Sequence, residues 1–514
     1  MTTGSPAPAS HAYAVRDTSR TALVLLALAL AFRLVYAATT GIVQDEAYYW
    51  QWSRHLDLGY FDAGPGIALA IRAGTLLLGD TPLGLRFVPI LLGGASGWLA
   101  YLTARRWLDG RAALWALLFT LTAPLLAAGS ILATYDLPQI FFWAAALYAL
   151  TRTLQEDRAG GWYAVGALFG LGMLCKPTMV LFAPGVLLLL ALSPAYRKWL
   201  VTPHPYLAMG VGVLVFSPVI VWNARHEYLN FAHTLGRGSR GSSDSRPFQH
   251  FDDFLGGQAL AVGLGAFLAE MYLVVRLFRA RGTDAERFVL AFTAPTFLLC
   301  FALATRAKLE INWPVAMHVT GLMAVGALFG GAWERGGWRR PLLVANFALS
   351  LVMIAVALFP GVVPALAGPV PARPTFEKPL ESYGWPTLTE EVEKARRALA
   401  AEGDTPVFPA SFTYRTASIL AFYLPGQPEV AKLQLPTTRL DQYRFWTRPE
   451  ELIGQNAVVA VDTDVDKSEA FLRQCFGRVE RRPVLRLTRE GFTGTVKEWH
   501  LFVCHDFRGY PPQP

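Results

Sequence analysis

The sequence predicts a polytopic α-helical membrane protein with a small α/β domain outside the membrane at its C-terminal end. Of the 514 residues, 53% are apolar and only 16% are charged, whereas a soluble domain carries about 25% charged residues. The mean hydropathy is +0.33. Apolar residues concentrate in 21–362, and residues 363–514 have the composition of a soluble domain. We therefore expect a transmembrane domain followed by an extramembrane domain.

The first apolar run, residues 21–39, is longer than the apolar core of a signal peptide, which has about 7–15 residues. We therefore predict an uncleaved first span and a cytoplasmic tail over residues 1–20. The formal net charge of +8 is explained by the lysines and arginines that membrane proteins carry in cytoplasmic loops. Because no nucleic-acid motif is present, we expect the lipid bilayer as a partner and no nucleic acid.

Twelve apolar segments are candidate spans. They are residues 21–40, 64–79, 84–104, 111–130, 137–151, 161–175, 177–192, 205–222, 256–275, 286–305, 313–332 and 340–360. The connectors richest in lysine and arginine are residues 104–111, 151–158, 193–199, 276–287 and 334–340. All of these connectors fall on the cytoplasmic side only if residues 64–79 do not cross the membrane.

Residues 64–79 are also the weakest candidate. The segment is short, contains Arg72 and opens with Gly64-Pro65-Gly66, so we interpret it as an interfacial or re-entrant helix. About eleven spans remain, with the N-terminus in the cytoplasm and the C-terminal domain on the outer, periplasmic face of the inner membrane. The first outer connector then covers residues 41–83.

In this topology the connectors on the outer face hold the unusual polar residues of the membrane domain. These are Asp45, Glu46, Asp62, Asp136, Lys176, Asn223, Arg225, Arg237, Lys308, Glu310 and Asn312. Charged groups at membrane depth are costly and are usually functional or paired. Their occurrence on one side of the bundle indicates a single site at the outer membrane surface.

The first outer connector combines carboxylates with aromatic rings in the segment DEAYYWQW (45–52). This spacing suits an amphipathic helix in the interface with its rings at headgroup level, and an aromatic belt with solvated carboxylates would give the same pattern. Two other residues also have simple structural interpretations. Asp136 before Pro138 suits a helix N-cap, and Lys176 between two spans suits a lysine that extends to the interface.

Together these residues suit the transfer of a sugar from a lipid phosphate. The leaving phosphate is a weak base and needs no general acid, so the site requires one base for the acceptor's proton and cations for the phosphate. Asp45 is the candidate base, and an aromatic ring such as Tyr48 can stack on the sugar. A glycosidase would instead need two carboxylates flanking the bond. The candidate phosphate-binding cations are Lys176, Arg86, Arg225 and Arg237.

Several segments resemble the GT-C membrane glycosyltransferases of glycosyltransferase family 39, a group that includes protein O-mannosyltransferases and the lipid A aminoarabinose and galacturonosyltransferases. The segment DEAYYWQWSRHLDLGYFD (45–62) resembles the first outer loop of this family. In order along the chain follow TYDLPQIFFWAAALYAL, GLGMLCKPTMVLFAPG, FSPVIVWNARHEYLNF, LEINWPVAMH and ASILAFYLPGQPEV. The matches extend over roughly residues 20–465, and their order makes the resemblance specific.

The resemblance implies a GT-C fold and an enzyme that transfers a sugar, with inversion, from a polyprenyl-phosphate donor to a glycolipid or protein acceptor. It implies Asp45 as the catalytic carboxylate and Glu46, Asp136 and Lys176 as further active-site positions.

One departure from the family pattern concerns the phosphate. Relatives often carry a basic residue where this chain has Ala63, in Asp62-Ala63-Gly64-Pro65. Another cation, such as Arg86 or Arg237, would then hold the phosphate, or the donor or acceptor differs. Asp62 itself stays a substrate-binding candidate, as do Asn223 and Asn312 in the matched Trp-Asn and Asn-Trp-Pro segments.

Two other classes of function stay open. A transporter or flippase of lipid-linked sugar would show an inverted repeat and polar residues at the bilayer midplane, and no clear repeat is present. A non-catalytic sugar-binding protein would explain Ala63. The sequence assigns no cofactor. A divalent metal is left open because His226 and His233 share an outer connector and His318 begins a span, although no tight ligand spacing is present.

The C-terminal residues predict a small α/β domain. Thr387 and Glu390 match the capping-box pattern for a helix near 388–402. Cys475 and Cys504 either form a disulfide in an oxidising compartment or stay free thiols. Strands are expected at 405–410, 457–463, 484–488 and 496–507, with a helix near 467–475.

Overall fold

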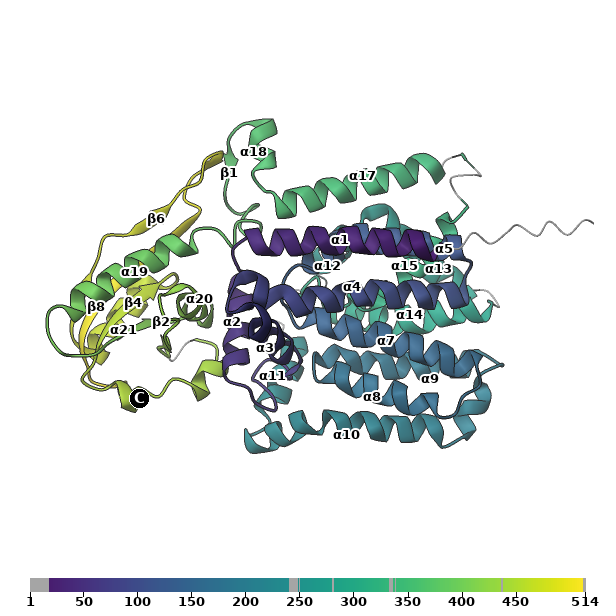
Figure 1. Cartoon of the computed structure of the whole chain (residues 1–514), viewed down its shortest axis with the longest axis horizontal. Coiled ribbons are helices and arrows are strands. Elements are labelled where there is room, and N and C mark those ends of the chain that lie inside the picture. Colours follow the sequence, from purple (N-terminus) through teal and green to yellow (C-terminus); the bar gives the residue numbers. More distant parts are fainter. Residues whose placement is uncertain are drawn as a thin grey trace, which may run out of the picture.

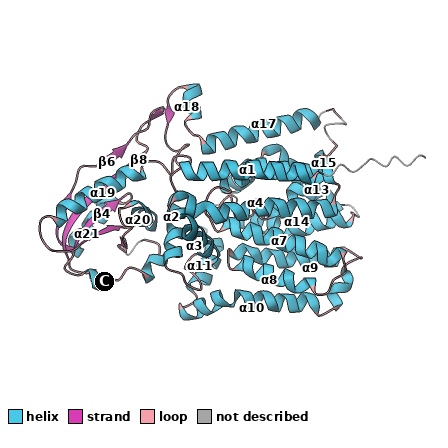
Figure 2. Cartoon of the chain, in the orientation of Figure 1, coloured by secondary structure: helices cyan, strands magenta, loops and turns pink. Residues whose placement is uncertain are grey.

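The computed structural model describes residues 18–239, 248, 250–279, 282–331, 336–337, 339–435 and 438–511. A bundle of long helices lies beside one another, and a domain built on a β-sheet sits at one end of that bundle (Figure 1). Strands occur almost entirely in the C-terminal part (Figure 2). The short helices α2 (Gln44–Arg54) and α3 (Gly66–Leu78) lie between the two parts.

Helices occupy each segment for which a span is predicted. They are α1 (Ser19–Thr39), α4 (Pro82–Trp107), α5 (Gly110–Thr122) with α6 (Pro124–Gly129), α7 (Asp136–Gln155), α8 (Gly161–Met173), α9 (Phe182–Leu192), α10 (His204–Arg225), α12 (Phe251–Val262) with α13 (Leu264–Arg279), α14 (Asp284–Ala304), α15 (Met317–Phe329) and α17 (Arg339–Leu358).

Length and composition support a smaller number of spans within the described residues. Five helices, α1, α4, α10, α14 and α17, are long and apolar enough to cross a membrane. The pair α12 and α13 would be a sixth span, bent by 110°. Gly263 forms the bend with φ +89°, a backbone conformation that favours glycine. The full number of eleven spans stays a prediction.

Three basic connectors lie at the end of the bundle far from the sheet, and two polar connectors meet at the other end (Figure 1). At the end far from the sheet, Nη2 of Arg106 lies 2.8 Å from Oε1 of Glu156, which joins the connectors 104–111 and 151–158. At the same end, Nζ of Lys198 lies 2.6 Å from Oδ1 of Asp157. At the other end, the side chain of Lys176 reaches the backbone carbonyl of Asn312 at 3.4 Å. The basic and the polar connectors therefore occupy separate ends.

The segment predicted to be interfacial forms α3. With 13 residues it is about 20 Å long, which is shorter than the roughly 30 Å hydrocarbon core of a bilayer. It packs on α2 and α4, while Leu76 and Leu77 are 70% and 69% exposed on its outer side. An amphipathic helix of this kind suits the membrane interface.

The C-terminal part is built on a mixed sheet whose main strand order is β3-β2-β4-β8-β5, with β6 paired to β8. β2 pairs in parallel with β3 and β4, and β8 pairs antiparallel with β4, β5 and β6. The strands are β2 (Val407–Ser411), β3 (Ala431–Lys432), β4 (Asn456–Val461), β5 (Phe476–Arg481), β6 (Leu485–Leu487) and β8 (Lys497–Phe507), and a separate parallel pair joins β1 (Val370–Pro371) to β7 (Phe492–Thr493).

Two expectations for this part need comment. The helix predicted from a Thr387 capping box begins earlier, as α19 (Trp385–Ala400), so the capping-box prediction is wrong. Gly384 caps the helix in the left-handed region with φ +87°, and Pro386 occupies its first turn, which moves the start upstream. Cys475 and Cys504 are both free thiols and are buried.

Helix α20 (Tyr414–Tyr423) joins the C-terminal part to the membrane bundle, and the sequence did not predict it. It packs along α2: the rings of Trp50 and Phe422 are 5.0 Å apart, and the hydroxyl of Tyr423 accepts the backbone N–H of Ile42 at 3.0 Å. Apolar residues of α2, α3, α19, α20 and β4 form one buried cluster. The helix that carries Asp45 is therefore held from both sides.

Candidate active site

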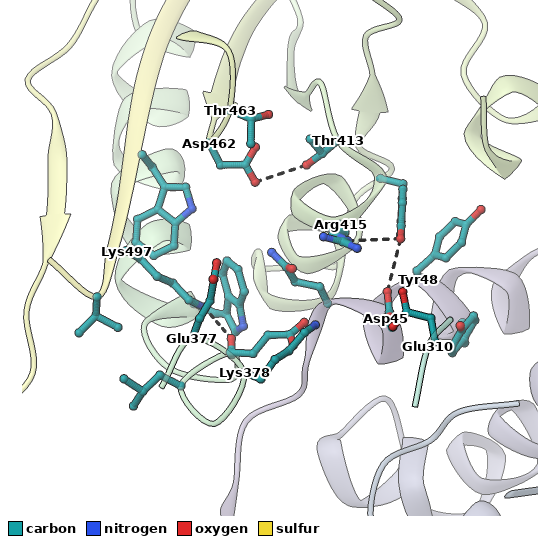
Figure 3. Close-up of a pocket in the computed structure, with 18 of the residues that line it drawn as sticks. Asp45, Tyr48, Glu310, Glu377, Lys378, Thr413, Arg415, Asp462, Thr463 and Lys497 are labelled. Atoms are coloured by element: carbon teal, nitrogen blue, oxygen red, sulfur yellow. Dashed lines mark hydrogen bonds and ion pairs between the residues drawn. The ribbon is translucent and has the colours of Figure 1, made fainter. Parts of the chain in front are cut away.

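A cavity of 610 Å³ lies between the outer end of the bundle and the C-terminal part (Figure 3). The bundle side contributes connectors that are far apart in the sequence. The segment 372–381, α19, α20, the turn after β4 and β8 contribute the other wall. Its polar and charged lining residues include Asp45, Asp62, Glu310, Asn312, Arg373, Glu377, Lys378, Glu381, Thr413, Arg415, Arg439, Asp462, Thr463, Lys497 and Glu498.

Asp45 lies in the first turn of α2, where the helix dipole favours a carboxylate. Its Oδ1 lies 3.5 Å from the hydroxyl of Tyr414, which is the donor of a long hydrogen bond. Burial raises the pKa of Asp45, and the negative charge of Glu381 adds to this, while Arg415 and Lys378 oppose it. A carboxylate with a raised pKa is a stronger base than an ordinary aspartate.

Asp136, Lys176 and Asn312 meet although they come from three different connectors. Nζ of Lys176 lies 2.5 Å from Oδ1 of Asp136, and Nδ2 of Asn312 donates to Oδ2 of Asp136 at 2.8 Å. Lys176 is only 5% exposed, so the interpretation of a lysine that extends to the interface is wrong. Asp136 is the first residue of α7 and makes no capping hydrogen bond, so the N-cap interpretation is also wrong.

A second, smaller cavity of 90 Å³ adjoins this ion pair. Lys176, Ala63, Pro177, Thr178 and Thr234 line it together with Asp62, Tyr135 and Trp313, and the last three also line the larger cavity. The hydroxyl of Thr178 is buried and, within the described chain, has no hydrogen-bond partner. A cavity with an ammonium group and an unsatisfied hydroxyl can take an oxyanion.

Two glycines bring the first outer connector against this cavity. A Cβ on Gly64 would lie 2.2 Å from the carbonyl oxygen of Leu174, and one on Gly66 would lie 2.4 Å from Sγ of Cys175. The backbone N–H of Gly66 donates to the Leu174 carbonyl at 3.0 Å. This close approach places Asp62 beside the turn that carries Lys176.

Asp62 is the second carboxylate of the larger cavity. It accepts the hydroxyl of Tyr48 at 3.0 Å, lies 3.3 Å from Nε2 of His233, and forms an ion pair with Arg439. Burial opposes its ionisation, but the neighbouring His233 and the charge of Arg439 outweigh burial and lower the pKa of Asp62. The pKa of Asp62 is therefore shifted in the opposite direction from that of Asp45.

The structure gives Glu46 and Arg86 a different place from the predicted one. Nε and Nη2 of Arg86 each donate to a Glu46 oxygen at 2.7 Å. Nη2 also donates to the Gly41 carbonyl, and Nη1 donates to the carbonyl and the hydroxyl of Thr40. Glu46 is fully buried and Arg86 is 1% exposed. The pair is enclosed where α1, α2 and α4 meet, and neither residue lines the cavities described above. Arg86 therefore does not reach the space in which we expected it to contact the phosphate.

The aromatic residues of the first connector are not displayed at headgroup level. Trp50 and Trp52 are completely buried, and Tyr48 is 3% exposed. They form the cluster under α20, and the Tyr48 ring lies 4.4 Å from that of Tyr414. The predicted interfacial belt is therefore wrong. Tyr48 lines the cavity mainly through the hydroxyl that donates to Asp62.

Three further candidates lie away from the cavity. The amide of Asn223 is buried, donates to the Val219 carbonyl at 2.9 Å and accepts the N–H of Phe231 at 3.1 Å, so it shapes the turn after α10. Arg225 is exposed at the end of that helix. The side chain of Arg237, in α11 (Leu229–Ser239), lies outside the described residues.

The histidines considered as metal ligands lie in separate places. His226 stacks on Trp222 at 4.1 Å, His233 contacts Asp62, and His318 contacts Glu270 at 2.9 Å inside the bundle. Across the described ranges, no group of three or more His, Cys, Asp or Glu side chains could hold a metal ion.

The C-terminal part brings functional side chains that sequence reasoning missed. Tyr414, Arg415 and Arg439 reach the cavity near Asp45 and Asp62. Lys497 lies with Nζ 3.3 Å from the centroid of the Trp385 ring, and burial lowers its pKa to about 7. In the sequence these residues do not differ from other polar and charged residues of a soluble domain. The only available signal was the matched segment ASILAFYLPGQPEV, which includes most of α20.

Comparisons with known proteins identify the class. Residues 62–222 match the family described as dolichyl-phosphate-mannose-protein mannosyltransferase. The chain is 30% identical over 322 residues to lipid A galacturonosyltransferase RgtD of Rhizobium johnstonii, covering 62% of this chain and 67% of that protein. It is 26% identical over 417 residues to the undecaprenyl phosphate-alpha-4-amino-4-deoxy-L-arabinose arabinosyl transferase of Pseudomonas paraeruginosa, covering 66% of this chain and 75% of that protein.

A solved structure shares the fold. ArnT from Cupriavidus metallidurans, bound to undecaprenyl phosphate, matches with a TM-score of 0.63 at 17% identity, over 96% of this chain and 100% of that chain. The protein is thus a membrane glycosyltransferase with the GT-C fold. It belongs to the family of dolichyl-phosphate-mannose-protein mannosyltransferase type that includes lipid A galacturonosyltransferase RgtD.

Proposed function

We propose that the protein transfers a sugar, with inversion, from a polyprenyl-phosphate donor to a glycolipid or protein acceptor at the outer face of the inner membrane. The single observation that carries the proposal is the larger cavity, where Asp45 lies at the junction of the membrane bundle and the C-terminal part. The relatives named above act in lipid A modification or use undecaprenyl-phosphate sugars. A transporter or a non-catalytic homologue is disfavoured by membership of this enzyme family.

In the proposed reaction Asp45 takes the proton of an acceptor hydroxyl. The acceptor oxygen forms a bond to the anomeric carbon, the bond from that carbon to the phosphate oxygen breaks, and the electron pair leaves with the polyprenyl phosphate. Lys176 holds that phosphate in the smaller cavity. Its ammonium carries three protons, of which the described contacts to Asp136 and Asn312 use two. Asp136 and Asn312 are positioning residues for Lys176.

The reaction is tested with purified protein and a panel of sugars linked to polyprenyl phosphate. We expect transfer to lipid A or another acceptor, a product with the opposite anomeric configuration, and release of polyprenyl phosphate. Sugars on polyprenyl pyrophosphate and nucleotide sugars serve as controls. A product that retains the donor's configuration would contradict direct attack by the acceptor.

The pH dependence should report the raised pKa of Asp45. The base works as a carboxylate, so kcat/KM is expected to fall as the pH decreases through that pKa, at a higher pH than for an ordinary aspartate of about 3.9. Lys497, whose pKa is about 7, could add a second transition. The two transitions are separated by measuring kcat/KM against pH in wild type and in Lys497→Met. The fall of kcat/KM that Asp45 causes at low pH should persist in the variant. An acid limb near pH 4 would contradict this prediction.

We also propose that residues 1–20 lie in the cytoplasm, that residues 21–362 form the membrane domain, and that residues 363–514 form a periplasmic domain. The separation of the basic connectors from the cavity end supports this orientation. Cysteines introduced at Leu76 and Leu77 should never react with an impermeant thiol reagent supplied from the cytoplasmic side. A cysteine in place of Arg158 is the positive control for that side. Labelling of a cysteine at residue 76 by reagent supplied from the cytoplasmic side would contradict the proposed orientation.

A further inference from the structure

Two guanidinium groups of the C-terminal part flank one tyrosine ring in the wall of the larger cavity. Cζ of Arg415 lies 5.6 Å and Cζ of Arg439 lies 5.8 Å from the centroid of the Tyr414 ring. Nε of Arg415 also donates to the Tyr414 hydroxyl at 3.3 Å, and the same hydroxyl contacts Asp45. Figure 3 shows Arg415 beside Asp45 in the cavity. Arg415 therefore lies next to the candidate base, and Arg439 lies next to Tyr414 and Asp62.

These arginines differ from the cations that the bundle encloses. Arg86 and Lys176 are each buried against a carboxylate, at 2.7 and 2.5 Å. Arg415 lines the cavity and, in the described part of the chain, forms no ion pair with a carboxylate, since its nearest partner is the Tyr414 hydroxyl. Arg439 shares Asp62 with His233, and its side chain is 40% exposed. Both guanidinium groups can therefore contact a ligand in the cavity.

The position of this arginine pair is fixed by packing. Arg415 lies in the first turn of α20, and α20 packs on α2, the helix of Asp45. At the same interface the hydroxyl of Tyr443 accepts Nε2 of Gln51 at 3.3 Å. The backbone N–H of Gln442 donates to the Tyr48 hydroxyl at 2.9 Å, three residues after Arg439. The segments that carry both arginines are therefore packed against the helix that carries Asp45.

We propose that Arg415 and Arg439 form a phosphate-binding site in which the C-terminal part holds a substrate phosphate beside Asp45. The planar guanidinium matches phosphate oxygens in bidentate hydrogen bonds. This inference rests on the proposed transferase function. Since Lys176 is proposed to hold the donor phosphate in the smaller cavity, we expect the arginines to hold a phosphate of the acceptor. A donor phosphate at the arginines would replace the assignment to Lys176, and the chemistry of recognition is the same.

The test measures binding to purified full-length protein rather than turnover. The probes are undecaprenyl phosphate, phosphorylated lipid A and dephosphorylated lipid A. We expect Arg415→Gln and Arg439→Gln to weaken binding of one phosphate-bearing probe by about tenfold to a hundredfold, since hydrogen bonds to charged groups have this effect. Lysine at either position should restore part of the affinity. Arg448→Gln, at an exposed arginine paired with Glu451, is the matched control.

The outcomes are distinct. Weaker binding of undecaprenyl phosphate assigns the site to the donor, and weaker binding of phosphorylated lipid A alone assigns it to the acceptor. Unchanged binding of both, or equal weakening with dephosphorylated lipid A, overturns the inference. The Asp45→Asn variant tests the transferase mechanism separately, because it should retain phosphate binding while turnover is lost. The failure of one proposal is therefore distinguishable from the failure of the other.

Discussion

Replacing Asp45 with asparagine is expected to reduce sugar transfer by about 10²–10⁴-fold, the usual contribution of a positioned general base. Asparagine keeps the size of the side chain and can still accept the Tyr414 hydroxyl, but it cannot take a proton. The measurement is single-turnover transfer with saturating polyprenyl-phosphate sugar, so that a change in donor affinity does not mask the chemical step.

The matched control is Asp404→Asn, at an exposed aspartate of the C-terminal part. It should leave the rate unchanged. The Asp45 variant should also keep the thermal unfolding midpoint of wild type in detergent, because removing a carboxylate with a raised pKa relieves rather than creates an electrostatic cost. Transfer at the wild-type rate in Asp45→Asn would remove Asp45 as the base.

The Arg86→Met variant should cause the largest loss of stability. It leaves Glu46 as an unpaired carboxylate inside the protein, and breaking a buried ion pair in this way costs about 3–5 kcal/mol. Since Arg86 also ties the end of α1 to α2 through Thr40 and Gly41, the helix that carries Asp45 should loosen as well. The measurement is the thermal unfolding midpoint of the purified protein, followed by transfer activity at low temperature.

A double variant separates the two roles that Glu46 and Arg86 could have. Arg86→Met with Glu46→Gln removes both charges. The single carbonyl oxygen of glutamine can still accept one of the two backbone N–H groups that Glu46 binds, from Val43 at 3.0 Å or from Ala133 at 2.8 Å. We expect part of the stability to return, and activity with it. A stable double variant without transfer would show instead that Glu46 has a direct catalytic role.

The membrane bundle was predictable because its signals are local. An apolar run predicts a helix wherever it occurs, and the basic connectors predict that residues 64–79 do not cross the membrane, which stays a prediction. The observed α3 covers 66–78. The ends of helices were less predictable than their positions. At α19, Gly384 and Pro386 set the start of the helix, whereas the capping pattern of Thr387 predicted a later start.

The sequence predicted the site only to the extent that the charges of the connectors indicate the end of the bundle at which each connector lies. The convergence of Asp136, Lys176 and Asn312 followed from placing their connectors at one end of the bundle. The sequence did not predict which groups pair with each other. Arg86 was predicted to bind phosphate, but in the structure it binds Glu46. Tyr414 lies 369 residues after Asp45, and no local pattern distinguishes it from other residues of a soluble domain.

Three side chains that line both cavities bear on how the products would depart. Asp62, Tyr135 and Trp313 line the larger and the smaller cavity alike. If the donor phosphate lies in the smaller cavity and the acceptor in the larger one, as we propose, these side chains stand between the two products. We then expect polyprenyl phosphate and the glycosylated acceptor to dissociate without an obligatory order.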